Sequence, residues 1–358
     1  MKNLLICFLL ITISVNQNLY GQEKAKTDTF SFSFEGKRRV GLVDQPVGRQ
    51  PSAMIILVPG SGKTNIFGGS GYADLRRHFV QQGIACVIWD KAGCGKSDGV
   101  FDPDQPVQNS AGEVIAAIEE LKHENVPGTN KIGLWGISRA GWICPLVIAQ
   151  YPSIAFWISV SGTDDKENFG YLLERNFLIE GRSISETKKL MDEWKKDNEL
   201  TAHGGSFEED LKATENLRRD PFYMFLSNNS VPTKEGYLAW QKKFETGENR
   251  VDKKSGLLIY VPDFEKTLNK IHCPVLAIFG EKDSQVDWRK TIGLYSKTLG
   301  KNSKTQLTIK TFPNGNHNLI ACKTGGYREQ LAVRQPCEGY IETMVEWLQD
   351  KGFTAIER

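Results

Sequence analysis

Short apolar runs recur along this chain, and segments with a helical pattern separate most of them. Continuous apolar runs occupy residues 53–60, 84–90, 131–136, 154–162 and 273–280, and a more polar strand pattern follows at 306–312. Helical patterns lie at 72–83, 110–123, 139–150, about 286–299 and 339–352. A continuous apolar run is typical of a strand that is covered on both faces of a parallel sheet. The alternation therefore predicts an α/β fold, with a mostly parallel sheet and helices on both faces.

The alternation has an N-terminal extension and one long interruption. Residues 29–36 alternate apolar and polar side chains, which is typical of a half-buried strand, and 38–46 is expected to pair with it. Residues 164–262 are rich in Lys, Glu and Asn, with helical patterns at 183–200 and 206–220. The strands that resume at 273 need the earlier sheet to pair with. We therefore predict a helical cap at 164–262 inserted into one core of residues 22–163 and 263–358, rather than a separate C-terminal domain.

The first 21 residues have the pattern of a secretory signal peptide. Lys2 is followed by a mostly apolar core from Leu4 to Val15, which is shorter than the roughly 20 residues of a membrane span. Cleavage is expected between Gly21 and Gln22, and an uncleaved anchor is the alternative. Removing this segment takes away one lysine and lowers the formal charge from +2 to +1. We therefore expect a secreted or periplasmic protein with no nucleic-acid partner and no remaining membrane segment.

The six cysteines after the signal segment contain no C-x-x-C pair, so no zinc cluster is expected. Cys322 and Cys337 flank a polar loop and could form a disulfide in an oxidising compartment, a point that the sequence leaves open.

Two stretches end like a phosphate-binding P-loop, namely "LVPGSGKTN" (57–65) and "WDKAGCGKSDG" (89–99). A P-loop begins with a glycine, which lets backbone N–H groups face the phosphates. Leu57 and Asp90 stand at that position, the first inside a strand pattern and the second bringing a carboxylate. Nucleotide binding is therefore not expected, and these glycines need another role.

The motif that carries chemistry is "GLWGISRAG", where Gly136-Ile137-Ser138-Arg139-Ala140 follows a buried strand pattern and opens a helix. It resembles the nucleophile elbow, Gly-x-Ser-x-Gly, of the α/β-hydrolase superfamily, with Ala140 at the fifth position. The resemblance covers nearly all of 36–352 except the cap. It is nearest to the branches that are like serine aminopeptidases and dienelactone hydrolases.

A serine nucleophile needs a base, and the base must be oriented by a third group. His317 directly follows the last strand pattern, whereas His78, His123, His203 and His272 lie on predicted helices, in the cap or at a strand entrance. For the acid, "GEKD" places Asp283 in the loop after 273–280 and matches the Gly-x-x-Asp of the superfamily. Asp287 is one alternative, and Asp164 or Asp165 is another. The order Ser138, Asp283, His317 is that of the α/β-hydrolase triad.

The resemblance also gives the first glycine-rich loop a role. It corresponds to the His-Gly oxyanion turn of the superfamily, with Pro59 in place of histidine. The resemblance implies that backbone N–H groups of Arg139 and of Ser61, or alternatively Gly62, stabilise the oxyanion. The second loop resembles the Asp-x-Arg-Gly-x-Gly-x-Ser-x-Gly loop of the superfamily, with Ala92 in place of arginine, and is expected to be a structural turn.

These observations predict a serine hydrolase that cleaves a carboxylic ester through an acyl-enzyme, with a small-molecule acyl substrate and no metal or cofactor. Alternatives within enzymes are a peptidase acting on short peptides and an acyltransferase or thioesterase. A catalytically dead binding module is the non-enzyme alternative.

Overall fold

The structure is a computed structural model that describes residues 25–68, 71–302 and 305–354. The predicted signal peptide lies outside the described residues. Within them, eight strands form one sheet in the order β1-β2-β4-β3-β5-β6-β7-β8. The strands are β1 (Ala25–Phe34), β2 (Lys37–Pro46), β3 (Ala53–Val58), β4 (Ile84–Trp89), β5 (Ile132–Ile137), β6 (Phe156–Val160), β7 (Val275–Gly280) and β8 (Leu307–Phe312).

The sheet is parallel except at its N-terminal edge. The predicted pairing of the first two strands is present, since β1 pairs antiparallel with β2 over their whole lengths. β2 is antiparallel to β4, and every further neighbouring pair is parallel. The mostly parallel sheet expected from the apolar runs is therefore confirmed.

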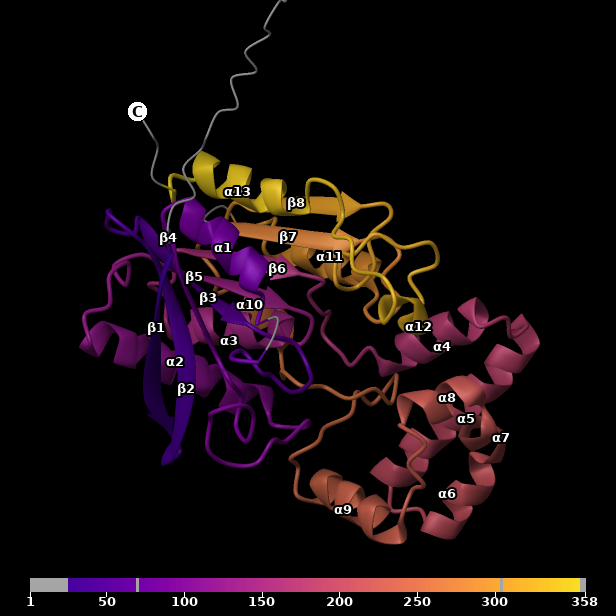
Figure 1. Ribbon diagram of the computed structural model, residues 1–358. Helices are drawn as coiled ribbons and strands as arrows, with labels where there is room; N and C mark the ends of the chain where they lie inside the picture. Colours follow the sequence, from indigo (N-terminus) through magenta and orange to yellow (C-terminus); the bar gives the residue numbers. More distant parts are fainter. Residues whose placement is uncertain (1–24, 69–70, 303–304, 355–358) are drawn as a thin grey trace, which may run out of the picture.

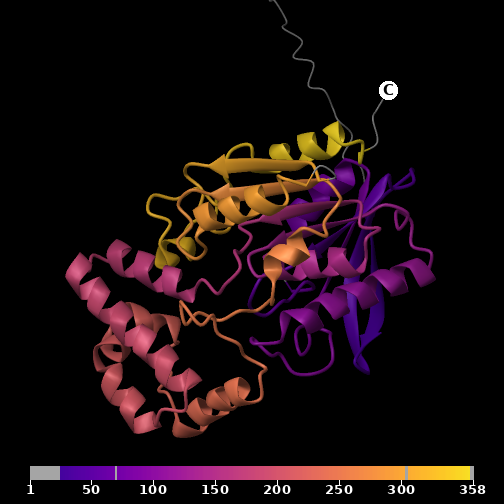
Figure 2. The same ribbon diagram turned by 180° about the vertical axis from the view of Figure 1, so that it is seen from behind.

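Helices cover both faces of the sheet (Figures 1 and 2). One face is covered by α1 (Ala73–Gln81) and α13 (Tyr340–Asp350), and the other by α2 (Val107–His123), α3 (Ala140–Gln150), α10 (Phe264–Leu268) and α11 (Trp288–Thr298). Successive strand residues point to opposite faces. Ile55 and Leu57 therefore belong to the α1/α13 core, whereas Ile56 and Val58 belong to the α2/α3 core.

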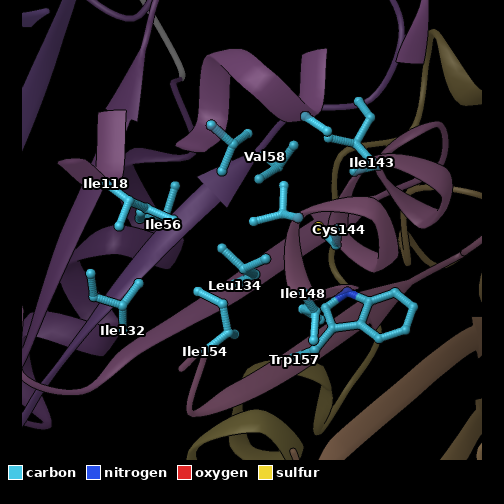
Figure 3. Packing of buried hydrophobic residues seen from close by; sticks show 14 of the residues in the cluster. Ile56, Val58, Ile118, Ile132, Leu134, Ile143, Cys144, Ile148, Ile154 and Trp157 are labelled. Atoms are coloured by element: carbon cyan, nitrogen blue, oxygen red, sulfur yellow. The ribbon is translucent and has the colours of Figure 1, made fainter. Parts of the chain in front are cut away.

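The core under α2 and α3 shows why the central strands are apolar throughout. Ile56, Leu134 and Trp157, from three adjacent strands, meet Ile118 of α2 and Ile148 of α3 (Figure 3). All five side chains are almost fully buried. A strand with helices on both sides has no face left for polar residues, and hence its sequence is a continuous apolar run.

Between β6 and β7 the chain forms a helical lobe beside the sheet (Figure 1). Its helices are α4 (Phe169–Ile179), α5 (Ile184–Ala202), α6 (Phe207–Ala213), α7 (Glu215–Arg219), α8 (Pro221–Leu226) and α9 (Lys234–Glu245). A separate apolar cluster holds it together, and includes Phe177, Trp194 and Phe222. We call α4–α9 the cap; the predicted limits 164 and 262 stay a prediction.

One cap helix differs from the sequence prediction. The pattern at 206–220 predicts one helix, but the structure breaks it into α6 and α7 at Thr214, whose φ and ψ are −115° and 22°. There the Thr214 hydroxyl donates to the carbonyl oxygen of Asp210 (2.7 Å) and accepts from Nε of Arg218 (2.6 Å). Arg218 also pairs with the buried Asp210 carboxylate. This local polar cluster lies at the break. Polar contacts do not alter the spacing of apolar residues, so the sequence pattern did not predict the break.

Candidate active site

Ser138 occupies a sharp turn between β5 and α3. Its φ is +57°, in the left-handed region that non-glycine residues rarely adopt. Such a conformation costs on the order of 1–3 kcal/mol and persists only where the surroundings impose it. Here the Ser138 N–H donates to the carbonyl oxygen of Val160 on β6 at 3.0 Å.

Small neighbours make this turn possible. A Cβ on Gly136 would lie 2.7 Å from Sγ of Cys144 and 2.9 Å from Cβ of Ala140, and a Cβ on Gly141 would lie 2.6 Å from the Thr163 nitrogen. Alanine is accommodated at position 140 because residue 136, across the turn, has no side chain. The departure from Gly-x-Ser-x-Gly at the fifth position is therefore compatible with the elbow.

The loops after β7 and β8 bring Asp283 and His317 together. Nδ1 of His317 lies 2.8 Å from Oδ2 of Asp283, and both side chains are buried. The other Asp283 oxygen, Oδ1, accepts the N–H groups of Gln285 (2.8 Å) and Val286 (3.0 Å). A carboxylate held in this way accepts the Nδ1 proton and leaves Nε2 with its lone pair.

The alternative acids have other partners. Asp287 caps α11, where its Oδ1 accepts the N–H of Lys290 at 3.4 Å. Oδ1 of Asp164 accepts from the Lys166 N–H and from Nδ2 of Asn168, both at 3.2 Å. Burial raises the pKa of Asp164 to about 6. Of these three acids, only Asp283 is within hydrogen-bond distance of His317.

The second contact of the candidate triad, between Ser138 and His317, is not a hydrogen bond in this structure. Among residues 25–68, 71–302 and 305–354, neither Nε2 of His317 nor Oγ of Ser138 has a hydrogen-bond partner. In enzymes without substrate such contacts are often long and tighten in the complex. The role of Ser138 as the nucleophile therefore stays a prediction.

The loop after β3 lies against the nucleophile turn. A Cβ on Gly60 would come within 3.0 Å of Cβ of Ser138 and 3.1 Å of the Ile137 carbonyl oxygen, so backbone approaches Ser138 at this point. Within the described part of the chain, the backbone N–H groups of Ser61 and Arg139 have no acceptor. Unpaired donors beside a serine are what an oxyanion hole requires.

A cavity of about 250 Å³ lies between Ser138, the loop after β3 and helix α4 of the cap. Ser61, Ser138 and Arg139 line it together with Trp142, Thr163, Gln285 and Val286 of the core, Phe169 and Leu172 of α4, and Tyr260. The volume suits a small or medium-sized ligand.

Two cap residues that the sequence did not single out hold the acid loop. The Tyr171 hydroxyl donates to the carbonyl oxygen of Asp283 at 3.1 Å. Nδ2 of Asn176, which is fully buried, donates to the carbonyl oxygen and to Oγ of Ser284, both at 3.2 Å. Tyr171 and Asn176 are five residues apart in α4, a spacing that does not mark a shared role in the sequence. The cap therefore positions the loop that carries Asp283.

The second glycine-rich loop folds around an internal anion. The Asp90 carboxylate is fully buried and accepts the N–H groups of Ile66 (2.9 Å) and Lys96 (3.2 Å). A Cβ on Gly95 would lie 1.8 Å from Asp90 Oδ2, so the glycine makes room for the carboxylate. Backbone donors that would face a phosphate in a P-loop instead face Asp90.

Neither the two cysteines considered for a disulfide nor the metal-ligand cluster found among the described residues lines the cavity beside Ser138. Cys322 and Cys337 are both free thiols in this structure. Glu120, His123 and Glu124, at the end of α2, could bring three ligand atoms within 4.8 Å of one another, but His123 and Glu124 are exposed. Among the described residues, no helix has the length and apolarity to span a bilayer.

The fold and this arrangement define an α/β hydrolase. The family model for X-Pro dipeptidyl-peptidases, the S15 family, matches residues 17–317, and the chain belongs to this family. The superfamily expected from the elbow motif is therefore confirmed.

Individual relatives are distant. The acyltransferase drtE of Aspergillus calidoustus is 27% identical over 109 residues, which are 27% of this chain and 34% of that protein. The alignment thus spans about a third of the curated relative. The esterase Pf2001 of Pyrococcus furiosus has a TM-score of 0.52 at 12% identity, with 91% of this chain and 93% of that chain covered. The acylaminoacyl peptidase of Pyrococcus horikoshii has a TM-score of 0.50 at 14% identity, with 92% and 42% covered. Both structures share the fold.

Proposed function

We propose that this protein cleaves a carboxylic ester through an acyl-enzyme formed on Ser138. The observation that carries the proposal is the buried hydrogen bond between Nδ1 of His317 and Asp283, in loops at the same sheet edge as the strained serine turn. In a protein of a serine-hydrolase family, this pair supplies the oriented base that a serine hydroxyl needs.

The mechanism follows from these positions. Oγ of Ser138 attacks the ester carbonyl carbon while Nε2 of His317 takes the hydroxyl proton. The tetrahedral oxyanion is stabilised by the N–H groups of Ser61 and Arg139, and collapse releases the alcohol with the proton from His317. Water then attacks the acyl-enzyme with His317 as base. Asp283 holds the imidazole tautomer and stabilises the imidazolium.

A peptidase is the second candidate, and one observation favours it. A further cavity of about 390 Å³ shares Phe169, Tyr260, Glu167 and Asp104 with the first, and its lining also includes Asp197 of α5. No lysine or arginine is among its lining residues. Such a cavity, with aromatic walls from the cap, suits an ammonium group such as the amino terminus of a peptide. The family description, X-Pro dipeptidyl-peptidase, agrees with this candidate.

The deciding experiment compares p-nitrophenyl esters of graded acyl length with aminoacyl and X-Pro p-nitroanilides. We expect ester turnover in the wild type and its loss, by several orders of magnitude, in Ser138→Ala. A higher kcat/KM on the anilides would favour the peptidase, and transfer to added alcohols or amines would favour an acyltransferase. A fluorophosphonate that labels Ser138→Ala at the wild-type rate would refute the nucleophile, and a wild type inert to every probe would favour a binding module.

We also propose that residues 1–21 are removed and that the protein acts outside the cytoplasm. The supporting observation is the short apolar segment after Lys2. Sequencing the amino terminus of protein expressed with its native leader should find Gln22 first. Retention of Met1 would contradict the proposal.

A further inference from the structure

The side chain of Lys91, which follows β4 and Asp90, contacts the proposed oxyanion turn. Nζ of Lys91 donates to the carbonyl oxygen of Gly60 and to that of Gly62, the latter at 2.9 Å. The Lys91 backbone N–H donates to Oγ1 of Thr64 at 2.8 Å, which ties the same loop a second time.

We propose that Lys91 is a positioning residue of the oxyanion hole, whose charged amine aligns and polarises the peptide that presents the Ser61 N–H. This inference rests on the serine-hydrolase mechanism proposed above. It assigns a role to a lysine that the superfamily motif does not single out.

The peptide between Gly60 and Ser61 explains how an amine bonded to a carbonyl oxygen can act on the N–H group of the next residue. The carbonyl of Gly60 and the N–H of Ser61 belong to one planar peptide group. A cation that bonds the carbonyl oxygen draws electron density away from the nitrogen, and so makes the N–H a stronger donor. Because the peptide is planar, fixing the direction of the carbonyl also fixes that of the N–H.

The turn is packed against Ser138 at Gly60 but is open at Gly62. Gly62 has a φ of +91°, and no atom lies within 4 Å of where its Cβ would be. The outer side of the turn is therefore not packed. Lys91 bonds the carbonyl on each side of Ser61 and so bridges the residue that bears the proposed donor.

The charge of Lys91 has no carboxylate bonded to it in the described part of the chain. Glu113 of α2 is already held by Nε of Arg39 (2.8 Å) and Nε1 of Trp89 (2.7 Å). The positive charge of Arg139, at the start of α3, repels the Lys91 amine. Asp102 and Lys91 line one small cavity together with Ser61 and Gly62 of the turn.

This environment makes the proton on Lys91 removable near neutral pH. Burial first, and the charge of Arg139 second, lower the pKa of Lys91 to about 8, while Cys94 and Glu113 act weakly in the opposite direction. A lysine with a lowered pKa is charged below that value and neutral above it. The positioning effect is therefore complete below pH 7 and lost as the pH rises through about 8.

The test measures the rate constant for fluorophosphonate labelling of Ser138 between pH 6 and 10.5, which needs no knowledge of the substrate. Oγ of Ser138 forms a bond to phosphorus, fluoride leaves, and the hydroxyl proton passes to His317. The phosphoryl oxygen occupies the oxyanion hole. A rate that falls at high pH would therefore report the loss of a proton that supports the reaction.

Four proteins are compared. The labelling rate constant of the wild type should fall as the pH rises, with a midpoint near pH 8. That of Lys91→Arg should show no such fall, because arginine stays charged. Lys91→Met should be about 10- to 100-fold slower at pH 7, less than the loss of a whole oxyanion donor, and should show no alkaline limb. Lys96→Met is the matched control, since Nζ of Lys96 lies over the Phe67 ring and not on the turn, and should behave as wild type.

Thermal melts establish that each variant folds, and Lys91→Gln provides a neutral but polar replacement if the methionine variant does not fold. With an ester substrate, the loss in Lys91→Met should fall on kcat rather than KM, because the oxyanion exists only in the transition state.

Two results would overturn the inference: Lys91→Met labelled at the wild-type rate at pH 7, or Lys91→Arg retaining the wild-type alkaline midpoint. These differ from failure of the proposed function, in which the wild type is labelled no faster than Ser138→Ala.

Discussion

Replacing Asp197 with asparagine should stabilise the protein at neutral pH and have little effect near pH 4. Asp197, on α5, lies in the wall of the larger cavity beside Asp210 of α6, which is fully buried. Oδ2 of Asp210 pairs with Arg218, and Oδ1 has no partner within the described residues. Burial first, and the neighbouring Asp210 second, raise the pKa of Asp197 to about 7. The folded protein therefore holds a proton there that the unfolded chain releases at low pH.

The sign and size of the effect follow from this difference. Below about pH 4 both states are protonated at Asp197, and its contribution is at its most favourable. From there to about pH 7 the folded state binds the extra proton, so stability falls by about 1.4 kcal/mol per pH unit. Three units would give about 4 kcal/mol, and we expect about 2 kcal/mol because solvent reaches part of the carboxyl group. Asparagine avoids this loss, and its amide can donate to Oδ1 of Asp210.

Urea unfolding at pH 4.5, 6, 7 and 8 measures the free energy of unfolding of Asp197→Asn against wild type. The difference should grow from near zero to about 2 kcal/mol and level off above pH 7. Asp192→Asn is the control, because this exposed residue of the same helix pairs with Lys195 and with no other described residue, and should show no such trend. A difference that is constant with pH, or that shrinks as the pH rises, would refute the reasoning.

Three further outcomes are expected. Asp283→Asn should lower kcat by a factor on the order of 10⁴ in the ester assay, while Asp287→Asn should do little. The reverse order would assign the role of the triad acid to Asp287. Glu113→Gln should lower the free energy of unfolding in urea by about 3 to 5 kcal/mol, because it leaves Arg39 charged and buried; a loss under 1 kcal/mol would show that the pair contributes little. ATP with Mg²⁺ should leave the melting temperature unchanged, whereas a boronic acid should raise it, since a ligand at a hundred times its Kd stabilises by about 2.7 kcal/mol. A clear ATP-dependent shift would restore the P-loop hypothesis.

The sequence by itself determined the elements and their class. Strands covered on both faces must be apolar throughout, so the runs that became β3, β4 and β5 could be found from the order of residues alone. The elbow around Ser138 was visible because its small neighbours lie within three residues of it. A sharp turn requires small residues close to it in the chain, and such a requirement can be recognised in the sequence without a structure.

Other features were decided only by the tertiary structure, because they join residues far apart in the chain. The sequence left Asp283 and Asp287 as rivals, and only the packing of two loops brings the first to His317 and leaves the second as a helix cap. Nothing near Lys91 in the chain shows that its amine reaches the carbonyl of Gly60, 31 residues earlier. Hydrogen bonds and charge pairs of this kind depend on where the sheet order places each loop, and they impose no periodicity on the residues that make them. The cap shows the same limit, since the polar cluster around Asp210 divides a helix whose apolar spacing predicted no break.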